Sequence, residues 1–327
     1  MGLEDLSQIT NLKQPFHKNL IVGFEGNEDG GVYQLDMQRD DVIVQSVDFI
    51  TPVVDDPYIY GQIAAANSLS DIFAMGAMVK TALNLLMWDK EHILASEVNE
   101  ILRGGLEKVL EAGGVLLGGH TISDLELKYG LSAMGEAKKH QIWRNNTAQI
   151  GDVLVLSKPI GSGIITTAMK NEKITLAQGM QTIDSMRMLN LKATQIAQKM
   201  EIHACTDITG FGLIGHSLEM CGTGGKSILF HTSAIPIFEN SIELALEGFV
   251  PGGSDANKSY LHTKVQVSCN LQEDIYYYDA QTSGGLLFAL PKQTSGDLVD
   301  KLRKSGYEHA CIVGEIIPQA AQSIILG

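Results

Sequence analysis

Short runs of β-branched residues alternate with longer runs of helical periodicity along most of this chain, and glycines separate them. Residues 41–47 and 79–87 are rich in apolar residues and predict two strands. Residues 57–75 are alanine-rich and predict a helix that stops at Gly76, because glycine is favoured just past a helix end. Residues 96–112 predict an amphipathic helix. The alternation predicts an α/β or α+β fold.

The length predicts two domains, because single hydrophobic cores stop growing near 250–300 residues and the chain has 327. A polar stretch at 143–150 separates two halves, and we place the boundary at Asn146, giving domains 1–146 and 147–327. The remaining predicted elements are strands at 115–117, 129–135, 153–157 and 204–207, one or two helices within 177–200, and a helix at 213–220.

Charge and cysteine spacing restrict the function classes. The net charge is −14, and no run of Lys and Arg is visible, which argues against a nucleic-acid partner. None of the four cysteines lies in a C-x-x-C pair, which argues against structural zinc and favours reduced, mostly buried thiols. No signal peptide or transmembrane run is visible, so we expect a cytoplasmic protein without a membrane partner.

Four aspartates stand where a charge among apolar residues has to be compensated. Asp29 precedes a strand, Asp48 follows residues 42–47, Asp71 lies on the alanine-rich helix, and Asp207 ends a strand. Hard oxygen ligands of this kind suit Mg²⁺, which binds a few carboxylates together with phosphate oxygens and water. For each aspartate taken alone, a cap, a turn or a salt bridge is the commoner explanation.

Asn67 and Asp71 form a more specific pair, because their spacing of four residues puts both on one face of the helix. Three small residues, 64–66, let another backbone come close to that face. The pair fits a metal with an adjacent phosphate, and it equally fits an Asn–Asp hydrogen bond on a solvated face.

Two glycine-rich stretches, Gly118-Gly119-His120-Thr121 and Thr282-Ser283-Gly284-Gly285, offer bare backbone N–H groups to a phosphate. Taken alone, a tight turn is the commoner explanation for each. His120 could contact a ligand, but taken alone it fits better as a satisfied buried histidine. The chain contains neither a Walker-type loop nor a G-x-G-x-x-G dinucleotide motif, and no G-x-S-x-G nucleophile elbow is present.

Several stretches, taken together and in order, resemble the selenophosphate synthetase family of the aminoimidazole-ribonucleotide-synthetase-like superfamily. They are Asn19–Gly23, Asp48–Pro57, Ile63–Gly76, Gly118–Ile122, Thr206–His216 and Gln281–Leu287.

The resemblance implies that ATP, selenide and water are converted to selenophosphate, orthophosphate and AMP. It also implies a fold of two α/β domains and a homodimer in which the N-terminal sheets pair into a barrel. Several Mg²⁺ ions would hold the ATP phosphates. By position, the metal ligands would be Asp29, Asp71 and Asp207, and the other nucleotide-site residues would be Gly26, Asn27, Glu28, Asp48 and Asn67, with Gly119, His120 and Thr121 from the opposite subunit.

The chain departs from the family pattern at several points. Gly30-Gly31 replaces alanines, Gln62 replaces a basic residue, and Ala256 replaces an arginine. The family's catalytic Cys or selenocysteine and its Lys belong upstream of Met1, so the catalytic residue is unknown and we expect an N-terminally incomplete form. The alternatives are a sister enzyme resembling thiamine-monophosphate kinase, or a non-catalytic ATP-binding relative.

Overall fold

The structure is a computed structural model that describes residues 15–24, 27–222, 224–271 and 273–327. The chain forms two compact units, which are described separately. The N-terminal unit comprises His17–Ile142 together with Ile183–Thr194, and the C-terminal unit contains Trp143–Thr182 and Gln195–Gly327. The predicted limits of 1–146 and 147–327 stay a prediction.

The N-terminal unit is built on a six-stranded sheet with the order β1-β2-β3-β6-β4-β5. The β4–β5 pair is parallel and the other pairs are antiparallel. The strands are β1 Leu20–Val22, β2 Gly31–Tyr33, β3 Asp41–Ile50, β4 Met78–Trp88, β5 Val115–Ser123 and β6 Lys128–Lys138.

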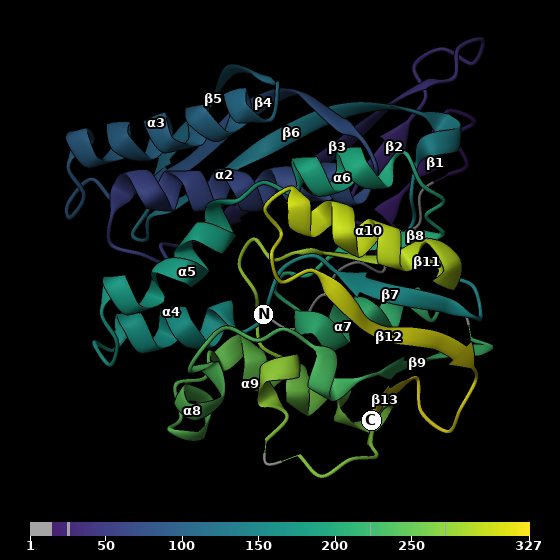
Figure 1. Cartoon of the computed structure of the whole chain (residues 1–327). Coiled ribbons are helices and arrows are strands. Elements are labelled where there is room, and N and C mark those ends of the chain that lie inside the picture. Colours follow the sequence, from purple (N-terminus) through teal and green to yellow (C-terminus); the bar gives the residue numbers. More distant parts are fainter. Residues whose placement is uncertain (1–14, 25–26, 223, 272) are drawn as a thin grey trace. The chain divides into compact units, whose positions relative to one another are not determined.

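Two helices, α2 (Pro57–Ala74) and α3 (Ala95–Glu111), cover one face of this sheet (Figure 1). The helix α2 begins where the Asp56 side chain accepts the backbone N–H of Ile59 at 2.9 Å, and Pro57 follows the cap. It ends before Gly76, whose φ of +73° suits glycine. Both predicted helices and the strands predicted at 41–47, 79–87 and 129–135 are confirmed.

The strand β5 differs from the prediction, because it runs through the glycine pair to Ser123 instead of ending at Leu117. Its ladder with β4 continues from Thr81 opposite Val115 to Trp88 opposite Ser123. Pairing with a long neighbour therefore overrides the low strand preference of two glycines.

The C-terminal unit is built on a seven-stranded sheet with the order β10-β13-β9-β12-β7-β11-β8. Because β11 is antiparallel to both β7 and β8, those two strands run in the same direction. The strands are β7 Asp152–Leu156, β8 Ala204–Asp207, β9 Lys226–Phe230, β10 Val265–Val267, β11 Leu286–Pro291, β12 Cys311–Pro318 and β13 Ile324–Leu326.

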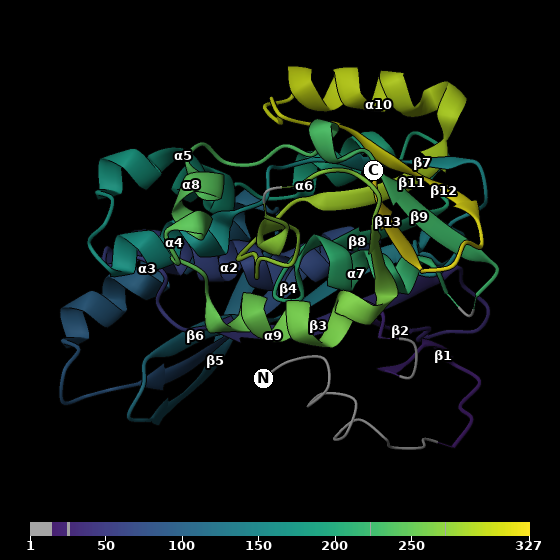
Figure 2. The ribbon, with the colours of Figure 1, turned by 90° about the horizontal axis from the view of Figure 1, so that it is seen from below.

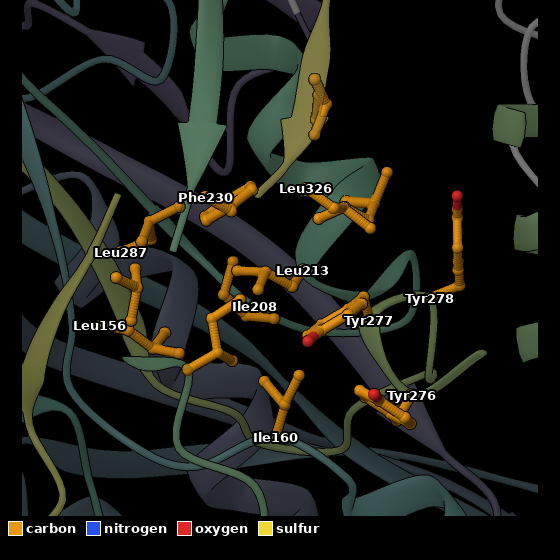
Figure 3. Close-up of a cluster of buried hydrophobic side chains, with 14 of the residues drawn as sticks. Leu156, Ile160, Ile208, Leu213, Phe230, Tyr276, Tyr277, Tyr278, Leu287 and Leu326 are labelled. Atoms are coloured by element: carbon orange, nitrogen blue, oxygen red, sulfur yellow. The ribbon is translucent and has the colours of Figure 1, made fainter. Parts of the chain in front are cut away.

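Helices cover both faces of this sheet. A cluster of buried apolar residues joins the sheet to α7 and neighbouring loops, and it contains Leu156, Leu213, Phe230 and Leu287 (Figure 3). Figure 2 shows α10 along the opposite face of β7, β11 and β12. The helices from here on are α4 Ser162–Lys170, α5 Leu176–Arg187, α6 Leu191–Ala197, α7 Gly212–Met220, α8 Ser241–Leu246, α9 Gly252–Leu261 and α10 Lys292–Lys304.

The segment Ile183–Thr194 belongs with the N-terminal unit although it lies far along the chain. Asn190 donates from Nδ2 to Ser70 Oγ at 2.9 Å, and Thr194 donates from Oγ1 to the carbonyl of Phe73 at 3.0 Å. These contacts attach the segment to the end of α2.

Candidate functional site

The carboxylate of Asp48 is held by α2. Asp48 lies near the end of β3, and Asn67 of α2 donates from Nδ2 to its Oδ2 at 3.1 Å. The hydroxyl of Ser68 lies 2.9 Å from the carbonyl oxygen of Asp48, and the backbone N–H of Leu131 donates to that hydroxyl at 3.1 Å. Asn67 is only 5% exposed, so the alternative of a solvated Asn–Asp pair does not describe it. The strand and the helix are therefore joined at Asp48.

A second connection lies beside the first. Ser46 donates its hydroxyl to Oδ2 of Asp71. Ser46 and Asp48 are two residues apart on a strand and share a face, while Asn67 and Asp71 share a helix face. Four oxygen-bearing side chains thus meet along the β3–α2 contact. Sequence reasoning missed Ser46, although its position two residues before Asp48 indicates the shared face.

Asp29 lies beside the same stretch of β3, on the side where β2 pairs with that strand. Gly31 lies opposite Gln45 in the antiparallel β2–β3 ladder, so the residues before Gly31 run along Ser46–Asp48. A Cβ on Gly30 would lie 3.1 Å from Val44 Cγ1, which shows how closely the segment approaches the strand. Asp29 and Glu28 are half-buried and Asn27 is exposed. Gly26 lies outside the described residues.

Gly119, His120 and Thr121 lie on β5, which is an edge strand of its sheet. His120 and Thr121 are exposed, so the alternative of a buried histidine is wrong for His120. A Cβ on Gly119 would lie 2.2 Å from the carbonyl oxygen of Asn84, so only glycine fits beside β4. The tight-turn alternative is wrong here, because these residues belong to the strand.

Asp207 ends β8 and is 1% exposed, and the loop that follows it is braced at three points. The N–H of Ile208 donates to Gly285 O at 2.9 Å, and the N–H of Gln281 donates to Thr209 O at 3.0 Å. Asn257 donates from Nδ2 to Gly210 O at 2.9 Å. The Asp207 loop is consequently held in one shape.

His216 on α7 is a further residue beside Asp207. A ring nitrogen of His216 and a carboxylate oxygen of Asp207 lie within 4.8 Å of one another. The N–H of Phe211 donates to Nε2 of His216 at 3.4 Å, which puts the ring proton on Nδ1. Burial lowers the pKa of His216 to about 4, so the ring is neutral at pH 7. Sequence reasoning quoted His216 only as part of a motif and gave it no role.

The second glycine-rich stretch packs against its neighbours. Gln281 Oε1 accepts the backbone N–H groups of Gly161 and Ser162 at 2.9 and 3.0 Å, which caps α4. A Cβ on Gly284 would lie 1.9 Å from Ile208 O, and one on Gly285 would lie 2.5 Å from Lys158 N. Close backbone approach therefore explains both glycines.

The cysteines of the chain are free thiols, and Cys205 and Cys221 are buried while Cys269 and Cys311 are half-buried. Burial raises the pKa of the Cys221 thiol to about 11, which leaves it protonated and inert at neutral pH. In the part of the chain that the structure describes, no helix combines the length and apolar character needed to cross a membrane.

Comparison with known families covers both units. Residues 27–137 match the family model described as AIR synthase related protein, N-terminal domain, and residues 149–327 match the corresponding C-terminal domain. A structure of thiamine-monophosphate kinase from Stenotrophomonas maltophilia K279a has a similar fold, with a TM-score of 0.68 over 95% of this chain and 92% of that one at 17% identity.

Two curated relatives are much closer in sequence. The selenide, water dikinase of Aliarcobacter butzleri is 45% identical over 100% of this chain and 94% of its own length. The selenide, water dikinase of Caldanaerobacter subterraneus is 44% identical over 97% of this chain and 91% of its own length. With both AIR synthase-related domains present and identity at this level over the full length, the chain belongs to the selenide, water dikinase family, also called selenophosphate synthetase.

Proposed function

We propose that Asp29, Asp71 and Asp207 bind the Mg²⁺ ions that carry ATP, and that Asp48 contacts metal or phosphate. The observation that carries this proposal is the double contact between β3 and α2, Asn67 to Asp48 at 3.1 Å and Ser46 to Asp71. It brings two half-buried carboxylates, an amide and a hydroxyl together, and a carboxylate partly removed from water is favoured where it is paired or binds a metal.

The activity is ATP-dependent synthesis of selenophosphate from selenide, with ATP as a substrate. ATP, selenide and water give selenophosphate, orthophosphate and AMP. A sister activity resembling thiamine-monophosphate kinase is less well supported, because the similarity to that kinase is 17% identity and extends to the fold alone.

The donor set fits Mg²⁺. ATP and the aspartates are all negatively charged and repel one another, so cations have to stand between them. Carboxylate, amide and hydroxyl oxygens are the ligands that Mg²⁺ prefers. When bound, Mg²⁺ neutralises and polarises the phosphoryl groups. Asn67 holds the Asp48 carboxylate in position, and the Ser46 hydroxyl does the same for Asp71.

The chain also forms a homodimer in this proposal, through the sheet face that α2 and α3 leave uncovered. Along β3 the residues alternate, with Val44 buried and Val47 and Phe49 exposed. Leu83 of β4 and Leu117 of β5 are also exposed. Exposed apolar side chains gathered on one face of a sheet are characteristic of a protein–protein interface. Pairing with the same face of a second copy would place the exposed His120 and Thr121 at the edge of that interface.

Asp71→Asn tests the metal site with little change of shape, because the amide oxygen can still accept the Ser46 hydroxyl. We expect Mg–ATP affinity to fall at least about tenfold, the size of a lost charge-assisted contact. Asp41→Asn is the control, since Asp41 begins β3, the strand that carries Ser46, and it pairs with Lys138 at the end of β3 away from Asp48. Isothermal titration of ATP with and without Mg²⁺ gives the measurement.

An Asp71→Asn protein that binds Mg–ATP as the unchanged chain does would refute the assignment. The nucleotide product separates the two activities: selenide-dependent AMP supports the dikinase, whereas ADP would indicate a kinase of the sister type.

A further inference from the structure

Asp71 lies in the last turn of α2, so the position of that turn decides where the carboxylate lies. The helix ends at Ala74. The last carbonyl groups of a helix lack partners in the regular pattern, and a helix end frays unless other groups hold it. Here the N–H of Gly76 donates to the carbonyl oxygen of Phe73 at 3.0 Å. The same oxygen also accepts a hydrogen bond from a residue outside the helix.

A segment from much later in the chain supplies this second bond. We call the segment Ile183–Thr194 the strap; it belongs to the N-terminal unit, although the residues before and after it belong to the other unit. Thr194 is fully buried and donates from Oγ1 to Phe73 O at 3.0 Å. Asn190 is also buried and donates from Nδ2 to Ser70 Oγ at 2.9 Å. Water does not reach these bonds, so loss of either donor removes a partner that nothing replaces.

The two attachment points of the strap lie on either side of Asp71 along α2. From the rise of an α-helix, Ser70 lies about 1.5 Å before Asp71 along the axis and Phe73 lies about 3 Å after it. Neighbouring residues are turned by about 100° from one another, so the side chains of Ser70 and Asp71 leave the helix in different directions. Asp71 accepts from Ser46 of β3, whereas Ser70 accepts from the strap. The last turn of α2 is therefore held by the sheet and by the strap.

We propose that Thr194 and Asn190 are positioning residues for Asp71, and that the strap holds the end of α2 in the place where the Asp71 carboxylate binds Mg–ATP. This rests on the proposed function, in which Asp71 is a metal ligand. The two strap residues act through the helix and contact neither metal nor nucleotide. A ligand set has to be held within about 0.5 Å of its productive geometry, and the residues behind the ligands provide this support. A helix end released on one side frays first, and Asp71 lies in that turn.

Four substitutions separate positioning from general support of the fold. Thr194→Val replaces the hydroxyl that holds Phe73 with a methyl group of similar size, and Thr194→Ser keeps the hydroxyl as the conservative rescue. Asn190→Ala removes the second attachment. Thr166→Val is the control for the loss of a threonine hydroxyl, because Thr166 donates from Oγ1 to Ser162 O at 2.9 Å within α4, a helix that carries no proposed metal ligand.

Isothermal titration of the full chain with ATP, over a series of Mg²⁺ concentrations, measures the effect. Each variant is titrated well below its melting temperature, which circular dichroism gives. We expect Thr194→Val and Asn190→Ala to weaken Mg–ATP binding at least about threefold and to raise the Mg²⁺ concentration that binding requires, because supports of metal ligands typically matter at this level or above. Thr194→Ser and Thr166→Val should stay within about twofold of the unchanged chain.

Thr194→Val combined with Asp71→Asn tests whether the strap acts through Asp71. If it does, Thr194→Val should change the affinity of the Asp71→Asn protein by less than about twofold, because the two effects are coupled. An equal loss in both backgrounds would overturn the proposal. So would a Thr194→Val protein that melts at a lower temperature but binds Mg–ATP unchanged, since the strap would then support the fold alone. Unchanged Mg–ATP binding by Asp71→Asn itself would instead exclude the proposed metal site, together with any role of the strap in it.

Discussion

Replacing Asp279 by asparagine perturbs the most completely enclosed carboxylate on the C-terminal unit. Asp279 is fully buried and accepts only from donors inside the unit. Its oxygens accept from Gly163 N at 3.0 Å, Ser254 Oγ at 3.0 Å and Gln281 Nε2 at 2.8 Å. The carboxylate thereby joins the start of α4, the start of α9 and the segment that braces the Asp207 loop.

The effect of pH on this residue has a definite sign. Burial raises the pKa of Asp279 from 3.8 to about 7, and the hydrogen bonds from Ser254, Gln281 and the start of α4 only partly oppose it. In the unfolded chain the group is already ionised at pH 5, whereas in the folded chain it keeps its proton until about pH 7. Its contribution to stability is therefore present at low pH and is lost as the pH rises toward 7. Over roughly two pH units, at 1.36 kcal/mol each, the loss is about 3 kcal/mol.

Urea unfolding of the unchanged chain and of Asp279→Asn at pH 5 and pH 8 measures this contribution. The asparagine stays neutral, so its free energy of unfolding relative to the unchanged chain should rise by about 3 kcal/mol between the two pH values. Subtracting the unfolding free energy of the unchanged chain from that of the variant cancels the titration of all other groups. Asp300→Asn, on the exposed side of α10, is the control. A difference that does not change with pH would refute the reasoning, because it would mean that the surrounding donors keep Asp279 ionised at pH 5.

Two further predictions concern the N-terminal unit. Gly61→Ala places a Cβ 2.0 Å from the backbone oxygen of Ile101, so α2 and α3 must separate and urea unfolding should show a loss of about 1–3 kcal/mol. A Cβ on Gly296 of α10 has no atom within 4 Å, so Gly296→Ala should raise the free energy of unfolding by up to about 1 kcal/mol. A rise in both variants would contradict the close packing of α2 against α3. Phe49→Glu should convert the proposed dimer to a monomer in light-scattering measurements of molar mass, because it puts a charge into the apolar sheet face. Leu246→Glu, equally 47% exposed but on α8, should not, and a Phe49→Glu protein of unchanged mass would exclude this face as the interface.

Helices and strands could be predicted from the sequence where residues close together in the chain determine them. The helix α2 could be predicted because Asp56, Pro57 and Gly76 mark its ends within the sequence itself. The strand β3 could be predicted from its Val and Ile content. The aspartates could be singled out because a carboxylate among apolar residues has to be compensated wherever it lies.

Other features depend on neighbours that are distant in sequence. The strand β5 continues through Gly118 and Gly119 because β4 pairs with it, and the segment 281–285 is shaped by the loops after β7 and β8. Ser46 lies beside Asp71 only because β3 packs against α2. His216 lies beside Asp207 only because the loop after β8 leads back into α7. The sequence by itself determined most of the helices and strands and the family, because propensity, capping and motif order are read along the chain. The tertiary structure decided which side chains meet, because hydrogen bonds and close backbone approach depend on distances that sequence spacing does not contain.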